Sequence, residues 1–248
     1  MEGPNCWNGA MMLSENSVKE WATRWQTTQL NVQREFLQHI FLSVLYQQPF
    51  SEKMFFKGGT ALRVVFGSPR FSEDLDFSAN ISSYTLSREM ERWAANVSQY
   101  GAETKITENK PTSGGHFAIF QSRLQGETVS ITCNVSLRKK GTPEAVLVAS
   151  PLLPSYQCLI LKTGDLVAEK IAALLTRKKP RDFFDLYFLL RERRGLEAIL
   201  PLKEKLLTEV GKAEAKSLYR ELKLFLPANY QKIASHLPEC LQSELKKL

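Results

Sequence analysis

Residues 54–78 read MFFKGGTALRVVFGSPRFSEDLDFS, and this stretch carries most of the information on function in the sequence. Its apolar start, the Gly58-Gly59 pair and the apolar residues after Thr60 predict a strand, a glycine turn and the beginning of a helix. Glycines let a backbone come close to a ligand, and the free N–H groups of a helix N-terminus can hold a phosphate. The Thr60 hydroxyl is expected either to cap this helix or to donate a further hydrogen bond to a phosphate.

The same stretch ends in a second predicted strand that carries two carboxylates. Alternate side chains of a strand share one face, so Asp74 and Asp76 should project together while Leu75 and Phe77 enter the core. Adjacent carboxylates repel each other unless a cation lies between them, and Mg²⁺ prefers carboxylates together with phosphate oxygens and water. A Gly-Gly turn or an Asp-x-Asp strand alone is usually only structural. Together they predict a site for a nucleoside triphosphate and Mg²⁺.

Two later segments add charged residues at unusual positions. Lys170 lies within the apolar stripe of a helix predicted over residues 165–177, so its charge must reach either solvent or a partner. Pro180 is expected to open the next helix, and an acid such as Asp182 in a first turn is favourable even without a function. Asp182 and Asp185 share one helix face. Asp185 is expected to be the partner of Arg181.

Four motifs in order resemble the AbiEii/AbiGii-type toxins, which are nucleotidyltransferase-like proteins of bacterial type IV toxin–antitoxin and phage-defence systems. Their relatives include mycobacterial nucleotidyltransferase toxins that modify tRNA. The resemblance covers roughly residues 30–190. The matching stretches are Lys57-Gly58-Gly59-Thr60-Ala61-Leu62, Arg70-x-Ser72-x-Asp74-Leu75-Asp76-Phe77, Glu169-Lys170-Ile171-Ala172-Ala173 and Arg181-Asp182-x-x-Asp185-Leu186.

The resemblance implies an α+β fold, in which a nucleotidyltransferase-like mixed sheet is flanked by helices and followed by a mainly helical C-terminal lobe. We place the nucleotidyltransferase-like lobe at residues 1–150 and the helical lobe at residues 151–248, with a linker over residues 143–154 that contains a short strand. Further predicted helices start at Ser17 and cover residues 31–48 and 87–99. Strands are predicted over residues 103–107, 116–124 and 127–137, the last two joined by a turn at Gln125-Gly126.

The resemblance also implies roles for individual residues. Those expected to be catalytic are Asp74, Asp76, Lys170 and Asp182; those expected to bind the nucleotide are Lys57, Gly58, Gly59, Thr60, Arg70 and Ser72; and the metal ligands are Asp74 and Asp76. The family places a third acid where this chain has Asn134. An amide can offer a metal an oxygen but neither charge nor a base, so either the two aspartates hold the metal alone or one ion is used where relatives use two.

The activity implied by the resemblance is that of a toxin, which transfers a nucleoside monophosphate from a nucleoside triphosphate to an RNA acceptor with Mg²⁺. A tRNA 3′ end is the first candidate acceptor, and a cognate antitoxin is the expected protein partner. One alternative is transfer to a protein hydroxyl, as in AMPylation or UMPylation. Another is a catalytically lapsed nucleotide- or RNA-binding protein, which Asn134 favours.

Composition narrows the possible partners and compartment. The 248 residues carry a net charge of +7, which suits a polyanion such as RNA but equally an acidic antitoxin, and the 43% hydrophobic content suffices for one large core or two modest lobes. Four cysteines and three histidines are scattered without metal-site spacing, which favours a reduced cytoplasm. No apolar run is long enough for a membrane span, and the start lacks a signal-peptide layout, with Met11 or Met12 as alternative starts.

Overall fold

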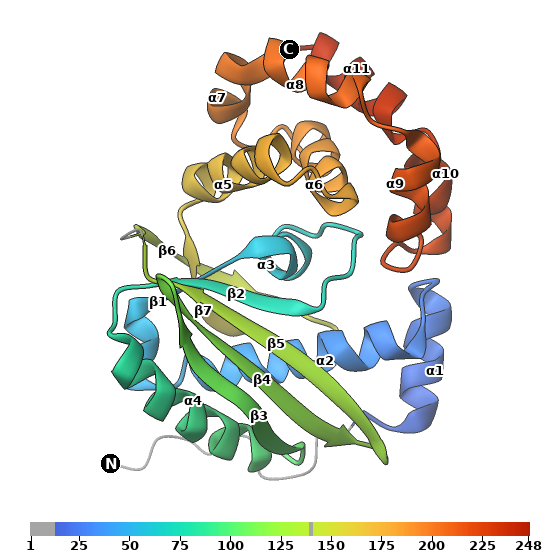
Figure 1. Cartoon of the computed structure of the whole chain (residues 1–248). Helices are drawn as coiled ribbons and strands as arrows, with labels where there is room; N and C mark the ends of the chain where they lie inside the picture. Colours follow the sequence, from blue (N-terminus) through green and yellow to red (C-terminus); the bar gives the residue numbers. More distant parts are fainter. Residues whose placement is uncertain (1–12, 139–140) are drawn as a thin grey trace.

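Within residues 13–138 and 141–248, which the computed structural model describes, seven strands form one mixed sheet (Figure 1). The strand order is β3-β4-β5-β2-β1-β7-β6. The β1–β7 and β2–β5 pairs are parallel and the other neighbours are antiparallel. The strands are β1 Met54–Lys57, β2 Asp74–Ala79, β3 Glu103–Thr112, β4 Gly115–Leu124, β5 Glu127–Ser136, β6 Pro143–Val148 and β7 Tyr156–Leu161.

Two long helices, α2 (Gln29–Leu45) and α4 (Ser83–Ser98), pack on each other and against β5 and β3 of the sheet (Figure 1). Helix α2 is buried over almost its whole length, and Trp93 of α4 is fully buried against Phe41 and Phe120. Helix α1 (Glu15–Arg24) packs on α2, and the short helix α3 (Gly58–Val64) connects β1 with the loop that leads to β2. The contacts of α2 and α4 with the sheet form part of the hydrophobic core.

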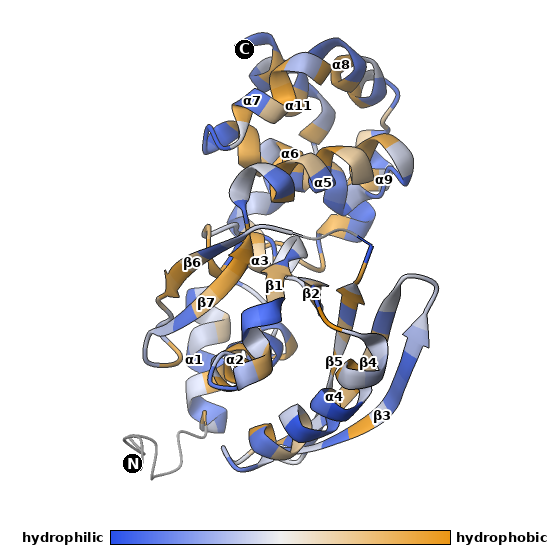
Figure 2. Cartoon of the chain, turned by 90° about the vertical axis from the view of Figure 1, so that its left-hand side faces the viewer, coloured by the Kyte–Doolittle hydropathy of each residue, from blue (hydrophilic) through white to orange (hydrophobic). Residues whose placement is uncertain are grey.

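The rest of the chain is helical and lies beyond one end of the sheet, as Figure 2 shows. One continuous hydrophobic core joins the sheet to these helices. The helices are α5 Thr163–Thr176, α6 Pro180–Arg191, α7 Leu196–Ile199, α8 Lys203–Gly211, α9 Ala215–Leu222, α10 Gln231–Ala234 and α11 Leu237–Lys246, with short 3-10 turns at Pro49–Lys53, Leu200–Leu202 and Ala228–Tyr230. The predicted α+β fold with a mixed sheet and a helical C-terminal region is confirmed.

Of the local predictions, the hairpin turn is confirmed, whereas the first helix start and one strand end are not. The β4–β5 hairpin turns at Gln125-Gly126, and both residues have positive φ (53° and 82°), as the tight turns of hairpins require. The predicted helix start at Ser17 is wrong, because Ser14 is the N-cap and its side chain accepts a hydrogen bond from the Ser17 N–H at 3.1 Å. Strand β3 runs to Thr112, five residues beyond its predicted end.

The sheet continues past residue 150. Strand β7 lies after that point and pairs in parallel with β1, with Phe56 opposite Ile160, and β6 of the predicted linker completes the edge. Alternating burial along β7 explains why a short apolar run becomes a strand here. The purely helical region therefore begins at α5, while the two-lobe division stays a prediction. The alternative starts at Met11 and Met12 lie outside the described residues.

None of the helices in the described ranges combines the length and apolar character that crossing a bilayer requires.

Candidate active site

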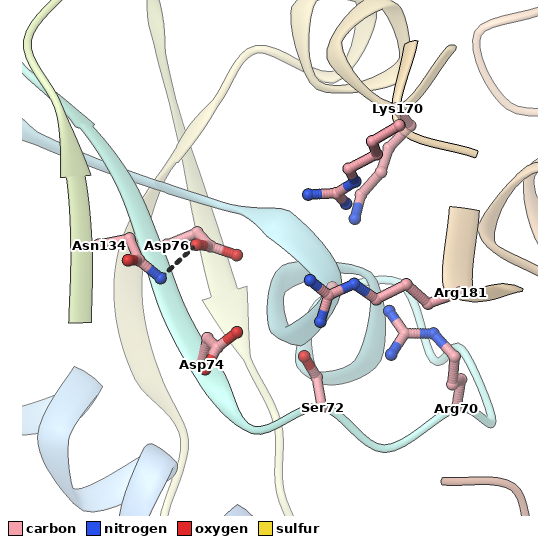
Figure 3. A pocket seen from close by; sticks show the side chains of 9 residues that line it. Arg70, Ser72, Asp74, Asp76, Asn134, Lys170 and Arg181 are labelled. Carbon is pink, nitrogen blue, oxygen red and sulfur yellow. Dashed lines mark hydrogen bonds between the residues drawn. The ribbon is translucent and has the colours of Figure 1, made fainter. Parts of the chain in front are cut away.

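A cavity of about 330 Å³ lies between the β1–β2 end of the sheet and the helices α5 and α6. Figure 3 shows the carboxylates of Asp74 and Asp76 and the Asn134 amide on one side, and Lys170, Arg70 and Arg181 on the other. Its wall thus has an acidic half from the sheet and a basic half from the loop and helices. The lining residues are Gly59, Arg70, Ser72, Asp74, Asp76, Asn134, Lys170, Arg177 and Arg181.

The acidic half comes from alternate residues of β2. Asp74 and Asp76 are half-buried on the cavity side, whereas Leu75 and Phe77 are fully buried in the core, so the predicted alternation is confirmed. Burial, and then the charge of Asp76, raise the pKa of Asp74, and Arg181 opposes this shift. The protein thus compensates the charge of this pair of neighbouring carboxylates only in part, as the raised pKa of Asp74 shows. Their oxygens fit a divalent cation such as Mg²⁺.

Asn134 occupies the position at which a third acid was expected. Strand β5 runs parallel to β2 with Asn134 opposite Asp76, and the Asn134 Nδ2 donates a hydrogen bond to the Asp76 Oδ1 at 3.2 Å. Within the described ranges, no three His, Cys, Asp or Glu side chains gather to hold a metal. The amide lessens the repulsion at Asp76 without adding charge, so the two aspartates remain the metal ligands that the site offers.

The glycine turn makes room for the protein's own site residues. Gly58 has φ +82°, and a Cβ there would collide with the Asp76 carboxylate. A Cβ on Gly59 would collide with the Arg70 guanidinium and come within 2.9 Å of the Ser72 Oγ. The two glycines therefore let the acidic and the basic half approach the first turn of α3 from opposite sides.

Three residues expected to bind the nucleotide do not line the cavity: Gly58 of the turn, Thr60 and Lys57. Thr60 is fully buried, and its hydroxyl donates to the Asp74 backbone oxygen, so it neither caps α3 nor faces the cavity. The Lys57 Nζ forms an ion pair with Glu169 at 2.8 Å, and Lys57 is the N-cap residue of α3. Thr60 thus attaches α3 to β2, and Lys57 attaches β1 to α5.

A fully buried carboxylate, Asp185 of α6, holds two of the cavity's cations. The Arg70 Nε and Nη2 donate to its two oxygens at 2.8 and 3.1 Å, and the Lys170 Nζ donates to its Oδ2 at 2.8 Å. Burial alone would raise the pKa of Asp185, but Arg70 and Lys170 outweigh burial and lower it to about 2. The expected Asp185–Arg181 pair is wrong, because Asp185 points inward to α5 and the loop while Arg181 points into the cavity.

Asp182, expected in the site, lies behind the wall of the cavity and does not line it. It is fully buried, accepts the Lys179 backbone N–H at 3.1 Å at the start of α6, and pairs with Arg177 through contacts of 2.9 and 2.6 Å. The hydrogen bonds that Arg177 donates to Asp182 raise the pKa of Arg177. Asp182 therefore orients Arg177, which lines the cavity, without lining the cavity itself.

Arg177 and Arg181 are lining residues that reasoning from the sequence did not assign to the site. Arg177 ends α5 and Arg181 lies in the first turn of α6, so the connection between the two helices delivers both guanidinium groups. Arg181 makes no ion pair with any residue in the described ranges. The signal in the sequence was the basic run over residues 177–181 at the proline-started beginning of α6, which places several cations at the junction of the two helices.

Comparison with known proteins shows which family and fold the chain shares. The family model for the nucleotidyl transferase AbiEii toxin of type IV toxin–antitoxin systems matches residues 40–246. The chain resembles the structure of MenT4, a nucleotidyltransferase toxin from Mycobacterium tuberculosis, with 18% identity and a TM-score of 0.68 over 95% of this chain and 90% of that one. It also resembles JHP933 from Helicobacter pylori, with 22% identity and a TM-score of 0.62 over 90% and 94% of the two chains. No curated protein sequence matches it.

Proposed function

Since the chain belongs to the AbiEii nucleotidyltransferase toxins of type IV toxin–antitoxin systems, we propose that it transfers a nucleoside monophosphate from a nucleoside triphosphate to an RNA acceptor, with a tRNA 3′ end as the first candidate. The observation that carries the proposal is the division of one cavity into an acidic and a basic half. A triphosphate with its metal ion carries both signs of charge and needs both halves at once.

The acidic half provides the metal site. Asp74 and Asp76 would hold Mg²⁺, which neutralises phosphate charge and helps to orient the α-phosphorus for in-line attack. Ionised Asp74 is needed for this role, and its raised pKa means that acid weakens the site before it would affect an ordinary aspartate.

The basic half binds and orients the phosphates. Lys170 and Arg70 are fixed by Asp185, and Arg177 is fixed by Asp182, so these cations keep their places before a ligand arrives. Charge placed in advance around the α- to γ-phosphates stabilises the leaving pyrophosphate as the bond from the acceptor oxygen to the α-phosphorus forms. Arg181 is the cation of this wall with no ion pair within the described ranges, and it faces Asp74 across the cavity (Figure 3). We assign it to the triphosphate.

The acceptor is proposed from charge and family together. A net charge of +7 suits RNA, and membership in a toxin–antitoxin family adds a cognate antitoxin as the protein partner. A protein hydroxyl is the other acceptor to test, because the cavity chemistry acts on the triphosphate and is the same for either acceptor.

Labelling tests the proposal directly. The protein is incubated with each α-labelled nucleoside triphosphate, Mg²⁺ and total tRNA, and the products are separated on denaturing gels for RNA and for protein. We expect label on RNA with the wild type and none with Asp74→Ala or Asp76→Ala, while circular dichroism shows the variants folded. Label on protein alone would exclude the RNA acceptor, and full activity of either variant would exclude the metal assignment.

One observation favours a second function. Asn134 stands where relatives are expected to have an acid, which would suit a binding protein without catalysis. The same gels decide this point: a binder retains the triphosphate on a filter but labels nothing. Binding by filter retention with no labelled product from any of the four triphosphates would favour it.

A further inference from the structure

Helix α9 carries a row of cations that the active site does not use. Lys216 and Arg220 of α9 and its C-cap residue Lys223 follow one another at helical spacing along one side and are all exposed. With Glu214, Ser217 and Tyr219 they line a groove of about 420 Å³. We call Lys216, Arg220 and Lys223 the α9 basic face.

Several basic residues of the helical region pair with carboxylates, whereas the α9 basic face does not within the described part of the chain. Lys178 and Lys212 both pair with Glu209, and Arg191 and Lys247 both pair with Glu244. None of the three residues of the face forms an ion pair or side-chain hydrogen bond with a residue of ranges 13–138 and 141–248. A row of unpaired cations attracts a polyanion.

The helix is held in a fixed position relative to the cavity. Directly after α9, the Phe225 backbone oxygen accepts the Phe71 N–H at 2.8 Å, and Phe71 lies between the cavity residues Arg70 and Ser72. The neighbouring Leu224 oxygen accepts the Asn31 Nδ2 at 3.2 Å, and α9 packs on α6, which carries Arg181. In Figure 2, α9 projects on the same side of the molecule as β3 and β4.

We propose that the α9 basic face holds the phosphate backbone of the RNA acceptor while its end enters the cavity. This inference rests on the proposed RNA-directed function. Seven residues of helix span about 10 Å, over which a double-stranded nucleic acid carries about six charges. This charge density suits three unpaired cations in a row. A folded acidic protein suits them less well, because its carboxylates are spread among other side chains.

The salt dependence of RNA binding tests the inference. A triple variant with Lys216→Ala, Arg220→Ala and Lys223→Ala is compared with a control that carries Lys203→Ala, Lys205→Ala and Lys246→Ala. The control loses the same charge from α8 and α11 of the same helical region, and its residues are also unpaired within the described ranges. Dissociation constants for total tRNA are measured by filter binding without nucleotide at several salt concentrations, and KM values are measured for tRNA and for the triphosphate.

Each phosphate contact contributes about 0.7 to 0.9 to the slope of log K against log salt, so we expect the α9 variant to lose about 2 to 3 from this slope. At about 0.1 M salt the same relation gives an affinity loss on the order of a hundredfold. The KM for tRNA rises accordingly, the KM for the triphosphate does not change, and the control behaves like the wild type.

The outcomes separate this inference from the proposed function. If the wild type labels RNA but the α9 variant keeps its slope and its KM for tRNA, the inference is wrong and the function stands. An equal loss in the control variant also overturns it, because net charge alone would then explain binding. If tRNA binds through α9 but no triphosphate labels it, the proposed transfer fails and the docking surface remains. If the α9 variant loses binding to an acidic protein but binds tRNA as the wild type does, the inference is also overturned.

Discussion

Replacing Asp185 by Asn removes one buried charge and leaves two buried cations without their carboxylate. The side chain is fully buried, and Arg70 and Lys170 lower its pKa from the usual 3.8 to about 2. A shift of this size corresponds to about 2 kcal/mol in favour of the folded state at neutral pH. Breaking a buried ion pair from one side typically costs about 3 to 5 kcal/mol, because the remaining charge is still buried. We therefore expect Asp185→Asn to lower the free energy of unfolding by about 2 to 5 kcal/mol.

Urea unfolding as a function of pH measures this loss. Because the folded-state pKa is depressed, the stabilisation by ionised Asp185 is complete above the unfolded value of 3.8 and disappears as the pH falls towards 2. The difference between wild type and Asp185→Asn should therefore be constant near neutral pH and shrink below about pH 4. Nucleotide transfer should fall as well, since Arg70 and Lys170 lose their common support.

Asp182→Asn is the matched control on the same helix. Asp182 is also fully buried, but its partner Arg177 keeps 44% of its side chain exposed, and Asn can still accept the N–H of Lys179. The expected loss is about 1 kcal/mol or less. Equal losses in the two variants, or a loss in Asp185→Asn that does not change between pH 7 and pH 3, would refute the argument that buried charge pairing orders the cation wall.

Three further predictions concern the acidic half. Asp74→Asn should raise the melting temperature of the metal-free protein near neutral pH, because burial and Asp76 raise the pKa of Asp74 and so disfavour its ionised form in the folded state. This gain in melting temperature should vanish below the unfolded pKa of 3.8. Thermal melts with and without Mg²⁺ should show stabilisation by the ion only in the wild type. Gly58→Ala and Gly67→Ala place a side chain at similar φ values, +82° and +78°, so backbone strain should cost each about 1 kcal/mol in stability. Gly58→Ala should lose more stability than Gly67→Ala, because only its Cβ collides with the Asp76 carboxylate, and only its kcat/KM should fall, on the order of a hundredfold. Equal kcat/KM values would contradict the assigned role of the turn. Asn134→Asp places a third carboxylate opposite Asp76 and should lower the free energy of unfolding of the metal-free protein by up to about 1 kcal/mol. It should also strengthen Mg²⁺ binding in calorimetry. Unchanged Mg²⁺ affinity would show that this position does not face the metal.

The acidic half could be predicted from the sequence because its geometry is local. Asp74 and Asp76 share a face as soon as residues 74–79 form a strand, and Leu75 and Phe77 show from composition alone which face is the core. The glycine turn follows similarly from Gly58, whose positive φ few other residues adopt. The position of Asn134 opposite Asp76 needs more, since the β2–β5 register joins strands far apart in the chain.

The basic half could not be predicted in the same way. Asp182 and Asp185 lie one helical turn apart in similar sequence surroundings, and both are buried. Their partners depend on how α6 rotates against α5 and on where the loop with Arg70 crosses, and no local pattern contains this information. Thr60 and Lys57 show the same limit: the motif predicts a phosphate site, but the packing of α3 on β2 and of β1 beside α5 decides which of its residues face the cavity.

The carboxylates of Asp182 and Asp185, which lie behind the cavity wall, explain how a cavity with opposite charges can stay open. Without it, Lys170, Arg70 and Arg177 could swing across and pair with Asp74 and Asp76, which would close the site with its own side chains. Asp185 holds the first two cations through three hydrogen bonds, and Asp182 holds the third through two. The cations are thereby neutralised enough to remain apart from the metal ligands, yet their outer N–H groups still face the cavity. Such prior orientation is what electrostatic stabilisation of a transferring phosphoryl group requires, because no reorganisation is then left for the reaction step.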